Sequence, residues 1–326
     1  MIRFKTPQGN YQSLTGEIIY DGKEADHRTL QSRAPYVCFK DVTSILNELH
    51  TVNGAYTVAN VSALEGLMSG GSSAGWMLYV IYKRATDPLQ YITTYHGFEF
   101  VNKKAVEVEF GNFRSSDKGE VETSVTIGAL EGDNALKRDQ VAIFNPEENT
   151  FISLDNRVRA SDNFFNSSIT LNDSIYLDRT PNSENTLGFD IAKLKIPNAQ
   201  NSIIANNASG VKLQFKTRAD RYFLFFTAFQ TTISETFYKE VSTPKPLEAI
   251  ASQESAPEPI IVEEPKQTRK ITPQPEAALI ETIAVEIENQ NITPPNEEVL
   301  RASNSAAVIV PDLQSGYYIV TNVFSS

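Results

Sequence analysis

The amino-acid sequence predicts an all-β fold, a β-sandwich of jelly-roll or Ig-like type with one short helix, followed by a disordered acidic, proline-rich linker. Two observations carry this prediction. Runs of alternating apolar residues, rich in β-branched and aromatic types and bounded by turn residues, recur from residue 1 to residue 238. A single segment in the same range has helical spacing. Many strands with regular turn signals favour packed sheets whose alternate residues face a shared core.

About a dozen strands are expected in this range. They lie at 16–20, 36–39, 55–61, 76–82, 91–98, 105–110, 122–129, 139–144, 169–171, 185–191, 211–217 and 222–233. The one expected helix covers 42–49, where apolar residues recur at helical spacing and Asp41 or Thr43 can cap the start.

Two of these runs are apolar on both faces. The run 76–82 has the pattern of a central strand packed on each side rather than an edge strand, and it is expected in the core of the sandwich. The run 222–233 crowds aromatic residues together. A strand buried on both faces explains it, and a stacking platform for sugars is the alternative. The aromatic residues concerned are Tyr222, Phe223, Phe225, Phe226 and Phe229.

The composition changes after residue 238. Between Lys239 and Gly316 there is no aromatic residue, prolines recur, and 13 acidic residues face 6 basic ones. Such a stretch cannot bury enough apolar surface to offset its ordering entropy. We therefore expect a sandwich domain over 1–238 and a disordered linker over 239–310. Within the linker, 277–287 has helical apolar spacing, which fits either a solvated spacer or a transient docking helix.

Charge and hydropathy restrict the partners. The acidic chain, with a net charge of −11, has no basic run that could bind phosphate backbones, so nucleic acid is not expected as a partner. No stretch has the roughly 18 apolar residues of a membrane-spanning helix. No signal peptide follows Met1, so the chain is expected to be either cytosolic or a fragment of a longer protein. The single cysteine, Cys38, reads as a buried strand residue.

Several motifs in the first part form an ordered series. They are Tyr56-Thr57-Val58-Ala59-Asn60-Val61, Ala74-Gly75-Trp76 with the following apolar run, Pro88-Leu89, Ile92-Thr93, Gly97-Phe98, Glu131-Gly132-Asp133 with Asp139, Asp162-Asn163-Phe164-Phe165-Asn166-Ser167, and Leu187-Gly188-Phe189-Asp190. Over roughly residues 10 to 235 this series resembles a β-sandwich module of cell-surface and envelope proteins of the Bacteroidota, including gliding-motility-associated proteins. His96 departs from the family pattern, which has Asp before Gly-Phe. An upstream strand expected from the family is missing before Met1, which supports a fragment.

A fresh strand pattern covers 315–324. It is similar to the first strand of SPOR-type domains, which bind peptidoglycan. We therefore expect 311–326 to be the start of a truncated SPOR-like domain, and peptidoglycan binding only through a complete downstream domain. The resemblance implies an exported protein, located in the periplasm, at the outer membrane or on the cell surface.

No catalytic constellation is apparent. His27, His50 and His96 are far apart and stand in no metal-ligand pattern, and no nucleophile elbow occurs. Clustered carboxylates and amides on turn-rich segments are the ligands that Ca²⁺ uses, although their spacing matches no EF-hand. The candidate calcium ligands are Glu131, Asp133, Asp139, Asp162 and Asn163. The sequence otherwise predicts no cofactor.

These observations predict a non-catalytic binding or scaffolding protein of the cell envelope or surface, associated with gliding motility or adhesion. Its expected partners are envelope or surface proteins or glycans. The alternative is a carbohydrate-binding sandwich or, with two facing acids, a carbohydrate-cleaving one.

Overall fold

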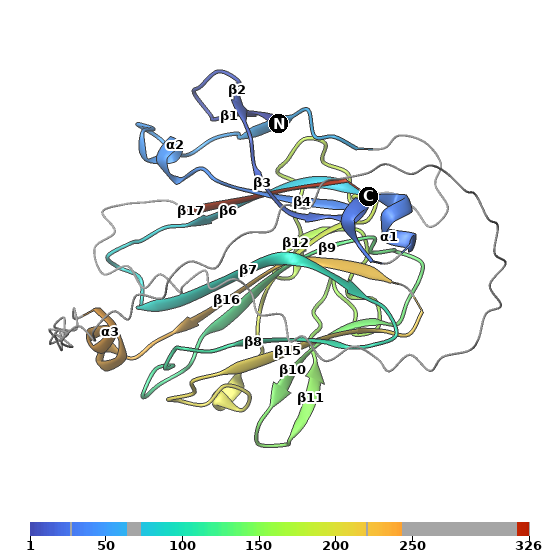
Figure 1. Ribbon diagram of the computed structural model, residues 1–326. Helices are drawn as coiled ribbons and strands as arrows, with labels where there is room; N and C mark the ends of the chain where they lie inside the picture. Colours follow the sequence, from blue (N-terminus) through green and yellow to red (C-terminus); the bar gives the residue numbers. More distant parts are fainter. Residues whose placement is uncertain (27, 64–72, 220, 243–317, 326) are drawn as a thin grey trace, which may run out of the picture. The chain divides into compact units, whose positions relative to one another are not determined.

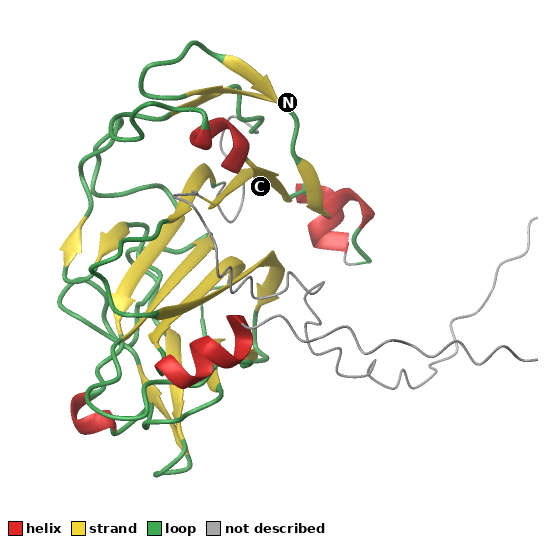
Figure 2. Cartoon of the chain, turned by 90° about the vertical axis from the view of Figure 1, so that its left-hand side faces the viewer, coloured by secondary structure: helices red, strands yellow, loops and turns green. Residues whose placement is uncertain are grey.

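The computed structural model describes residues 1–26, 28–63, 73–219, 221–242 and the backbone of 318–325, all within one compact unit. Strands dominate these residues, and the helices are short (Figures 1 and 2). Four sheets pack in layers through three apolar clusters. The predicted all-β sandwich is confirmed, and it carries two further sheets on one side.

The largest sheet has six strands in the order β13-β12-β14-β9-β16-β7. All neighbours pair antiparallel except β12 and β14, which are parallel. The strands are β7 (Gln90–Val101), β9 (Thr123–Leu130), β12 (Ile169–Leu171), β13 (Ser174–Ile175), β14 (Phe189–Lys195) and β16 (Tyr222–Thr232).

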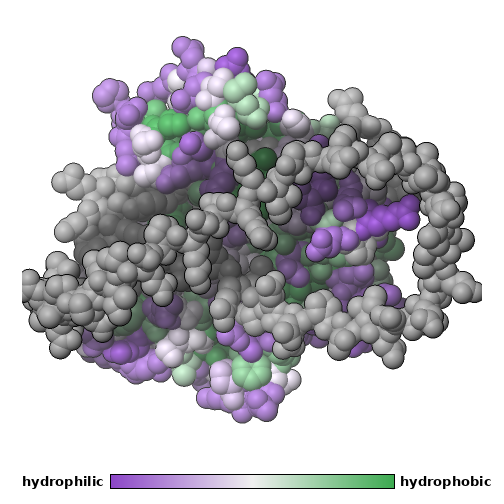
Figure 3. All heavy atoms as spheres, in the orientation of Figure 1, coloured by the Kyte–Doolittle hydropathy of each residue, from purple (hydrophilic) through white to green (hydrophobic). Residues whose placement is uncertain are grey.

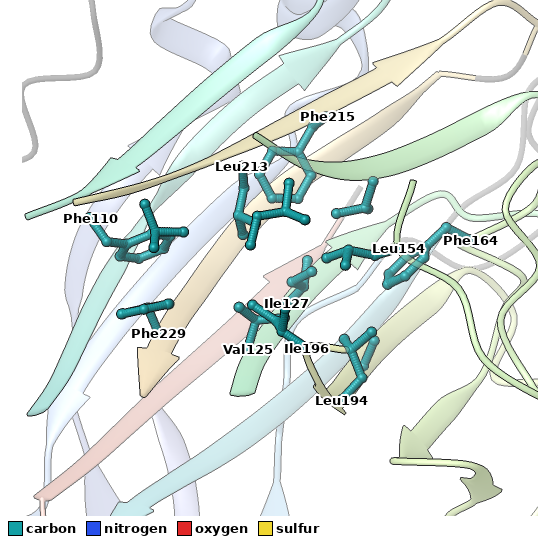
Figure 4. Close-up of a cluster of buried hydrophobic side chains, with 14 of the residues drawn as sticks. Phe110, Val125, Ile127, Leu154, Phe164, Leu194, Ile196, Leu213, Phe215 and Phe229 are labelled. Carbon is teal, nitrogen blue, oxygen red and sulfur yellow. The ribbon is translucent and has the colours of Figure 1, made fainter. Parts of the chain in front are cut away.

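One face of this sheet packs on a four-stranded sheet of order β11-β10-β15-β8, which completes the sandwich. Its strands are β8 (Val106–Phe110), β10 (Asp139–Asn145), β11 (Thr150–Ser153) and β15 (Val211–Thr217). In Figure 4, Phe110, Leu213 and Phe215 of the smaller sheet point toward Val125 and Phe229 of the larger one. Phe229 is fully buried, and its ring lies 5.2 Å from that of Phe110. Alternation of apolar residues along each strand produces this core.

The other face of the six-stranded sheet packs on a sheet of order β3-β4-β17-β6. Its strands are β3 (Glu17–Asp21), β4 (Tyr36–Asp41), β6 (Ala74–Ile81) and β17 (Tyr318–Ser325). A three-stranded sheet, together with α2 (Thr43–Asn47), covers its outer face. That sheet consists of β2 (Gln12–Leu14), β1 (Ile2–Lys5) and β5 (Thr57–Ala59).

β16 is the strand buried on both faces that the aromatic run predicted. A β-bulge between Leu224 and Phe226 interrupts the alternation, so Phe225 and Phe226 both face the second core, whereas Phe229 faces the first. Gly128 on neighbouring β9 leaves room for this, because a Cβ there would lie 2.4 Å from the Phe225 ring. Burial on both faces is confirmed for β16.

The run 76–82 behaves differently from its prediction. Both faces of β6 are packed, Met77 in one cluster and Trp76 in the other, but β6 is the edge strand of its sheet among the described residues. The prediction of a central strand is therefore wrong. Layers on both sides partly cover β6 although it is an edge strand, so an apolar pattern on both faces does not report strand order.

The helices also depart in part from prediction. The expected helix forms as α2, and the structure adds α1 (Arg28–Arg33), α3 (Glu235–Ser242) and the 3₁₀ turns η1 (Gly22–Glu24) and η2 (Ala199–Asn201). α3 packs on the sandwich through Phe237 and Tyr238 and extends four residues past the predicted boundary at 238. The rest of the predicted linker, 243–310, lies outside the described residues.

The strand near the end of the sequence was assigned to a second, truncated domain. In the structure the backbone of 318–325 forms β17, hydrogen-bonded on both sides within the β3-β4-β17-β6 sheet, and the further domain stays a prediction. An isolated strand gains little on its own, whereas two open strand edges satisfy its backbone polar groups.

The surface of the described part carries both hydrophilic and hydrophobic residues. On the side shown in Figure 3, hydrophilic residues predominate at the periphery of the described part. Among the described residues no helix is both long and apolar enough to cross a membrane.

His96 gives the fold a dependence on pH. On β7 its ring stacks on Phe39 of β4, with centroids 4.5 Å apart, between two sheets. Burial lowers the pKa of His96, and Glu17 acts in the opposite direction. Since the folded-state pKa lies below the unfolded value of about 6.5, the unfolded state binds more protons below that pH. The contribution of His96 to the free energy of unfolding is therefore fully present above about pH 6.5 and is lost as the pH drops through the lowered pKa.

We expect His96→Gln to remove a few tenths of a kcal/mol of this acid-induced loss, a small amount because solvent partly screens the half-buried ring. Urea unfolding of parent and variant at pH 7.5 and pH 5.5 measures it. Equal losses in both proteins would show that His96 does not contribute.

Candidate functional site

Three motif segments that are distant in sequence meet at one end of the pairing between β9 and β14. β9 ends at Leu130, paired with Phe189, and the chain turns through Glu131-Gly132-Asp133. The segment 162–167 lies against that turn, since the Ser167 hydroxyl donates to the Gly132 carbonyl oxygen at 2.6 Å. The segments singled out from the sequence therefore build one region.

A fully buried ion pair lies beneath this region. Arg159 and Asp190 have no exposed side-chain surface, and Arg159 Nη1 lies 2.6 Å from Asp190 Oδ1. The guanidinium makes five hydrogen bonds. Their acceptors are Asp190 Oδ1, Thr170 Oγ1 and the carbonyl oxygens of Phe164, Ser168 and Ile191. All five N–H groups of the side chain can therefore be satisfied.

The Asp190 carboxylate has three donors. Besides Arg159, the amide of Ser168 donates to Oδ1 at 3.1 Å and the amide of Ser167 to Oδ2 at 3.0 Å. Burial raises the pKa of Asp190, while the charge of Arg159 and these hydrogen bonds act in the opposite direction. Two opposite charges with complete hydrogen bonding are what a buried ion pair requires. This pair fixes the segment 164–168 against β14.

Ser167 connects the buried Arg159–Asp190 ion pair to the turns at the surface. Its backbone is left-handed, with φ of 57°. Its hydroxyl donates to Gly132 and accepts from the amide of Gly188 at 3.0 Å. Its carbonyl oxygen accepts from the amide of Thr186 at 2.9 Å. One serine thus holds the two turns that follow β9 and precede β14.

An open groove of about 950 Å³ lies over these turns. Polar and apolar surface contribute equally to its lining, which includes Glu131, Asp133, Asn134, Asn185, Leu187 and Arg221. The side chains offer carboxylate and amide acceptors beside amide and guanidinium donors. Such a surface can recognise a ligand through several directed hydrogen bonds.

Three residues that line the groove have a backbone conformation that is unfavourable for their side chains. Glu131, Ser167 and Leu187 all line it, with φ of 69°, 57° and 53°, a left-handed conformation that side chains other than Gly, Asn and Asp adopt at a cost. Leu187 is also 76% exposed, so burial does not offset its strain. Strained residues gather at binding and catalytic sites because the surrounding structure holds them there. The groove is therefore the candidate functional site.

Leu187→Asn is expected to raise the free energy of unfolding by about 0.5–1 kcal/mol, because Asn tolerates the left-handed conformation better. Chemical denaturation measures it. Leu171→Asn is the matched control, since Leu171 is also exposed but lies on β12. A gain at both positions would trace the effect to lost surface hydrophobicity rather than to backbone strain.

The five candidate calcium ligands are only partly brought together. Glu131 and Asp133 line the groove, and Asp133 Oδ1 accepts from the amide of Ala135 at 2.6 Å, as in an Asx turn. Asp139 is buried and accepts from the amide of Phe165 at 2.7 Å. The backbones of Asp139 and Asn163 form a β-bridge, and the Asp162 carbonyl oxygen accepts from the amide of Arg138. Within the described residues no group of three His, Cys, Asp or Glu is placed to hold a metal ion.

The calcium hypothesis stays a prediction. Asn163 Oδ1 is buried and accepts no hydrogen bond within the described part of the chain, so this oxygen is open to a cation or a water as its partner. If calcium binds, excess EGTA lowers the Tm and added Ca²⁺ restores it. An unchanged Tm on chelation would contradict the hypothesis.

No sequence pattern singles out Arg159. It lies in a polar segment next to the exposed Arg157, and the two have the same local pattern. The available signal was Asp190, a carboxylate within a strand that otherwise alternates cleanly, because a buried charge needs a partner.

No family model matches the sequence, and no curated protein matches it. Solved structures of infectious bursal disease virus resemble part of the chain: the Gt strain at 14% identity with a TM-score of 0.20, and the VP2 subviral particle at 13% with a TM-score of 0.18. Each match covers 71% of this chain, which spans about half the length of those chains, 54% and 55%.

Proposed function

We propose that this chain is a non-catalytic binding and scaffolding module of a bacterial cell envelope or surface, and that its groove receives an envelope protein or a glycan. The motif series in the sequence motivates the location, and association with gliding motility or adhesion follows from the same resemblance. The protein would be exported. Peptidoglycan binding would need a complete downstream domain.

One observation carries the binding role. Three strained, non-glycine residues line a groove of equal polar and apolar surface, and a buried ion pair with complete hydrogen bonding fixes the turns that hold them. Such a surface is already ordered before it meets a partner, so binding costs little conformational entropy. Backbone strain held over a rigid foundation is typical of a recognition site.

A glycan is the second candidate, favoured by the planar polar side chains of the groove. Carboxylates, amides and a guanidinium match the donor and acceptor pattern of sugar hydroxyls. No aromatic residue stands among the described residues that line the groove, so sugar binding there would rest on hydrogen bonds rather than on stacking.

The test compares two double variants of the full chain. L136D/L187D places two charges in the groove, where both leucines are exposed, and L171D/L177D places two charges at exposed leucines outside the groove lining. Each protein is incubated with solubilised envelope fractions and with a panel of immobilised bacterial glycans. Partners are identified by mass spectrometry, and affinities are measured by surface plasmon resonance.

We expect the groove variant to weaken binding by about tenfold or more and the control variant to leave it nearly unchanged. Equal loss in both variants would show that the groove is not the site. If the unaltered chain binds neither envelope proteins nor glycans, the proposed function is wrong.

A further inference from the structure

The sheet β3-β4-β17-β6, which we call the cover sheet, is narrower than the six-stranded sheet on which it packs. At one side Tyr20 of β3 stacks on Phe98 of β7, with ring centroids 4.0 Å apart. At the other side β6 begins over β14, since a Cβ on Gly75 would lie 2.4 Å from the ring of Phe189. The cover sheet therefore spans the width from β7 to β14, and β12 and β13 extend beyond β6.

The two strands beyond β6 carry exposed apolar side chains. Ile169 of β12 is opposite Ile191 of β14, and both pack at the margin of the second core. Leu171 lies two residues further along β12 and therefore on the same face. Tyr176 follows β13 in register opposite Ile169, to whose carbonyl oxygen its amide donates at 2.8 Å. Leu171 is 45% exposed and Tyr176 is 40% exposed. We call Ile169, Leu171 and Tyr176 the ledge.

β6 borders the ledge with an open backbone edge. Among the described strands it pairs with β17 alone, over its whole length and without a register shift. It contains no charged residue and no proline. The opposite edge strand of the cover sheet, β3, has a register shift between Ile18 and Tyr20 and carries Glu17 and Asp21. Irregularity and charge protect an edge strand against pairing, so β3 has this protection and β6 lacks it.

Two lysines make the surface beside β6 basic. Lys193 and Lys195 follow Ile191 along β14 at intervals of two residues, which places them on the face of the ledge. Both are exposed, and Lys193 is opposite Leu171. Within the described strands β12, β13 and β14 they are the only charged residues on this face. A strand added beside β6 would place its side chains near these ammonium groups, which favours carboxylates in that strand.

We propose that β6 and the ledge accept an extended, acidic segment of another protein as an added strand of the cover sheet. The backbone of the segment pairs with the open edge of β6. Its inward face carries apolar residues that pack on Leu171 and Tyr176, followed by carboxylates near Lys193 and Lys195. In strand addition, main-chain hydrogen bonds give affinity and alternate side chains give specificity. None of these residues lines the groove, so the proposal does not depend on what the groove binds.

The single tryptophan provides a direct readout, because Trp76 lies on β6 itself. The probe is a dansyl-labelled synthetic peptide of about nine residues. One face of the peptide carries valine, isoleucine and two glutamates, and threonine occupies the positions between. The peptide is made with the apolar pair first and with the acidic pair first, which covers both strand directions. Energy transfer from Trp76 to the dansyl group measures its binding to the full chain.

Charge reversal tests the role of the lysines. We expect the acidic peptide to bind K193E/K195E at least about tenfold more weakly than the unaltered chain, because attraction becomes repulsion. A peptide with lysine in place of glutamate should show the opposite preference. K23E/K118E is the matched control, since it makes the same change of charge at two exposed lysines outside the ledge. It should leave both affinities nearly unchanged.

Hydrogen exchange tests the pairing of the backbone. In the free chain, alternate amides of β6 should exchange faster, because they point away from β17. The acidic peptide should slow their exchange. The matched control peptide has the same side chains and N-methylated amides, so it cannot donate hydrogen bonds to β6, and it should neither bind nor protect.

Three results would overturn the proposal. The acidic peptides fail to bind, or the N-methylated form binds equally well. All amides of β6 are protected in the free chain, so that its edge is already covered. K23E/K118E weakens binding as much as K193E/K195E, which would reduce the effect to net charge.

The ledge and the groove can be told apart in the same experiments. The groove variant L136D/L187D should leave peptide binding unchanged, because neither leucine belongs to the ledge. Among envelope proteins, a partner that is lost with L171D/L177D and kept with L136D/L187D contacts the ledge rather than the groove. Failure of this proposal is therefore distinguishable from failure of the proposed function.

Discussion

Arg159→Met should lower the free energy of unfolding by about 3–5 kcal/mol, because it leaves the carboxylate of Asp190 buried without its counter-charge. The variant also removes the hydrogen bonds that Arg159 donates to three backbone carbonyl oxygens and to Thr170 Oγ1. Methionine fills a similar volume, so the loss reports charge and hydrogen bonding more than a cavity. Urea denaturation followed by tryptophan fluorescence measures it, with Trp76 as the single reporter.

Arg157→Met is the matched control, two residues away. Arg157 is exposed and donates to the backbone carbonyl oxygen of Asp173 at 2.6 Å. We expect its replacement to cost less than about 1 kcal/mol. Replacing both members of the buried pair, as in R159M/D190L, should recover part of the loss, because no buried charge then remains. A loss below 1 kcal/mol for R159M would show that the pair does not stabilise the fold.

Gly132→Ala should lower the free energy of unfolding by about 2–3 kcal/mol, which is near the upper end of the usual destabilisation by overpacking substitutions. A Cβ at this position would lie 2.1 Å from Asp190 Oδ2 and 2.8 Å from the carbonyl oxygen of Phe165. Neither atom can retreat freely, since Asp190 is held by Arg159 and by the amide of Ser167. A methyl group would therefore push the turn after β9 away from the buried Arg159–Asp190 ion pair and change the shape of the groove that this turn lines.

Gly97→Ala is the control for this substitution. Gly97 lies on β7, and a Cβ there meets no atom within 4 Å. Alanine should be neutral or slightly stabilising at that position, since it reduces the freedom of the unfolded chain. Equal destabilisation at both glycines would rule out the steric explanation. Binding of the groove partner should fall with G132A and stay unchanged with G97A.

Sequence patterns predicted the sandwich because its strands obey local rules. The twelve expected runs all contain a strand, although the run 185–191 becomes a strand only from Phe189. The short strands β1, β2, β11 and β13 were missed, since two to four residues are too few to show a period. The stacking of further sheets on the sandwich depends on which faces meet, and a period of two along one strand does not report that.

The candidate site was predicted less well than the fold. The motif segments were found, because glycine, aspartate and asparagine in turn-rich stretches stand out. Their meeting point was not, since the contact between Arg159 and Asp190 joins residues 31 apart that no local rule connects. Calcium binding by the carboxylates stays a prediction, and the sequence did not indicate that Asp133 and Asp139 both accept hydrogen bonds from backbone amides. Local sequence shows which residues are polar, but not which donors they will face.

The position of β16 has a consequence for synthesis of the protein. This strand completes the six-stranded sheet by pairing with β7 and β9, whose residues precede it by roughly a hundred positions or more. A chain leaving the ribosome from its N-terminus therefore presents β7 and β9 with open edges until residue 232 has emerged. Those edges carry apolar side chains destined for two cores. We therefore expect truncation just before β16 to yield an aggregating product rather than a smaller domain.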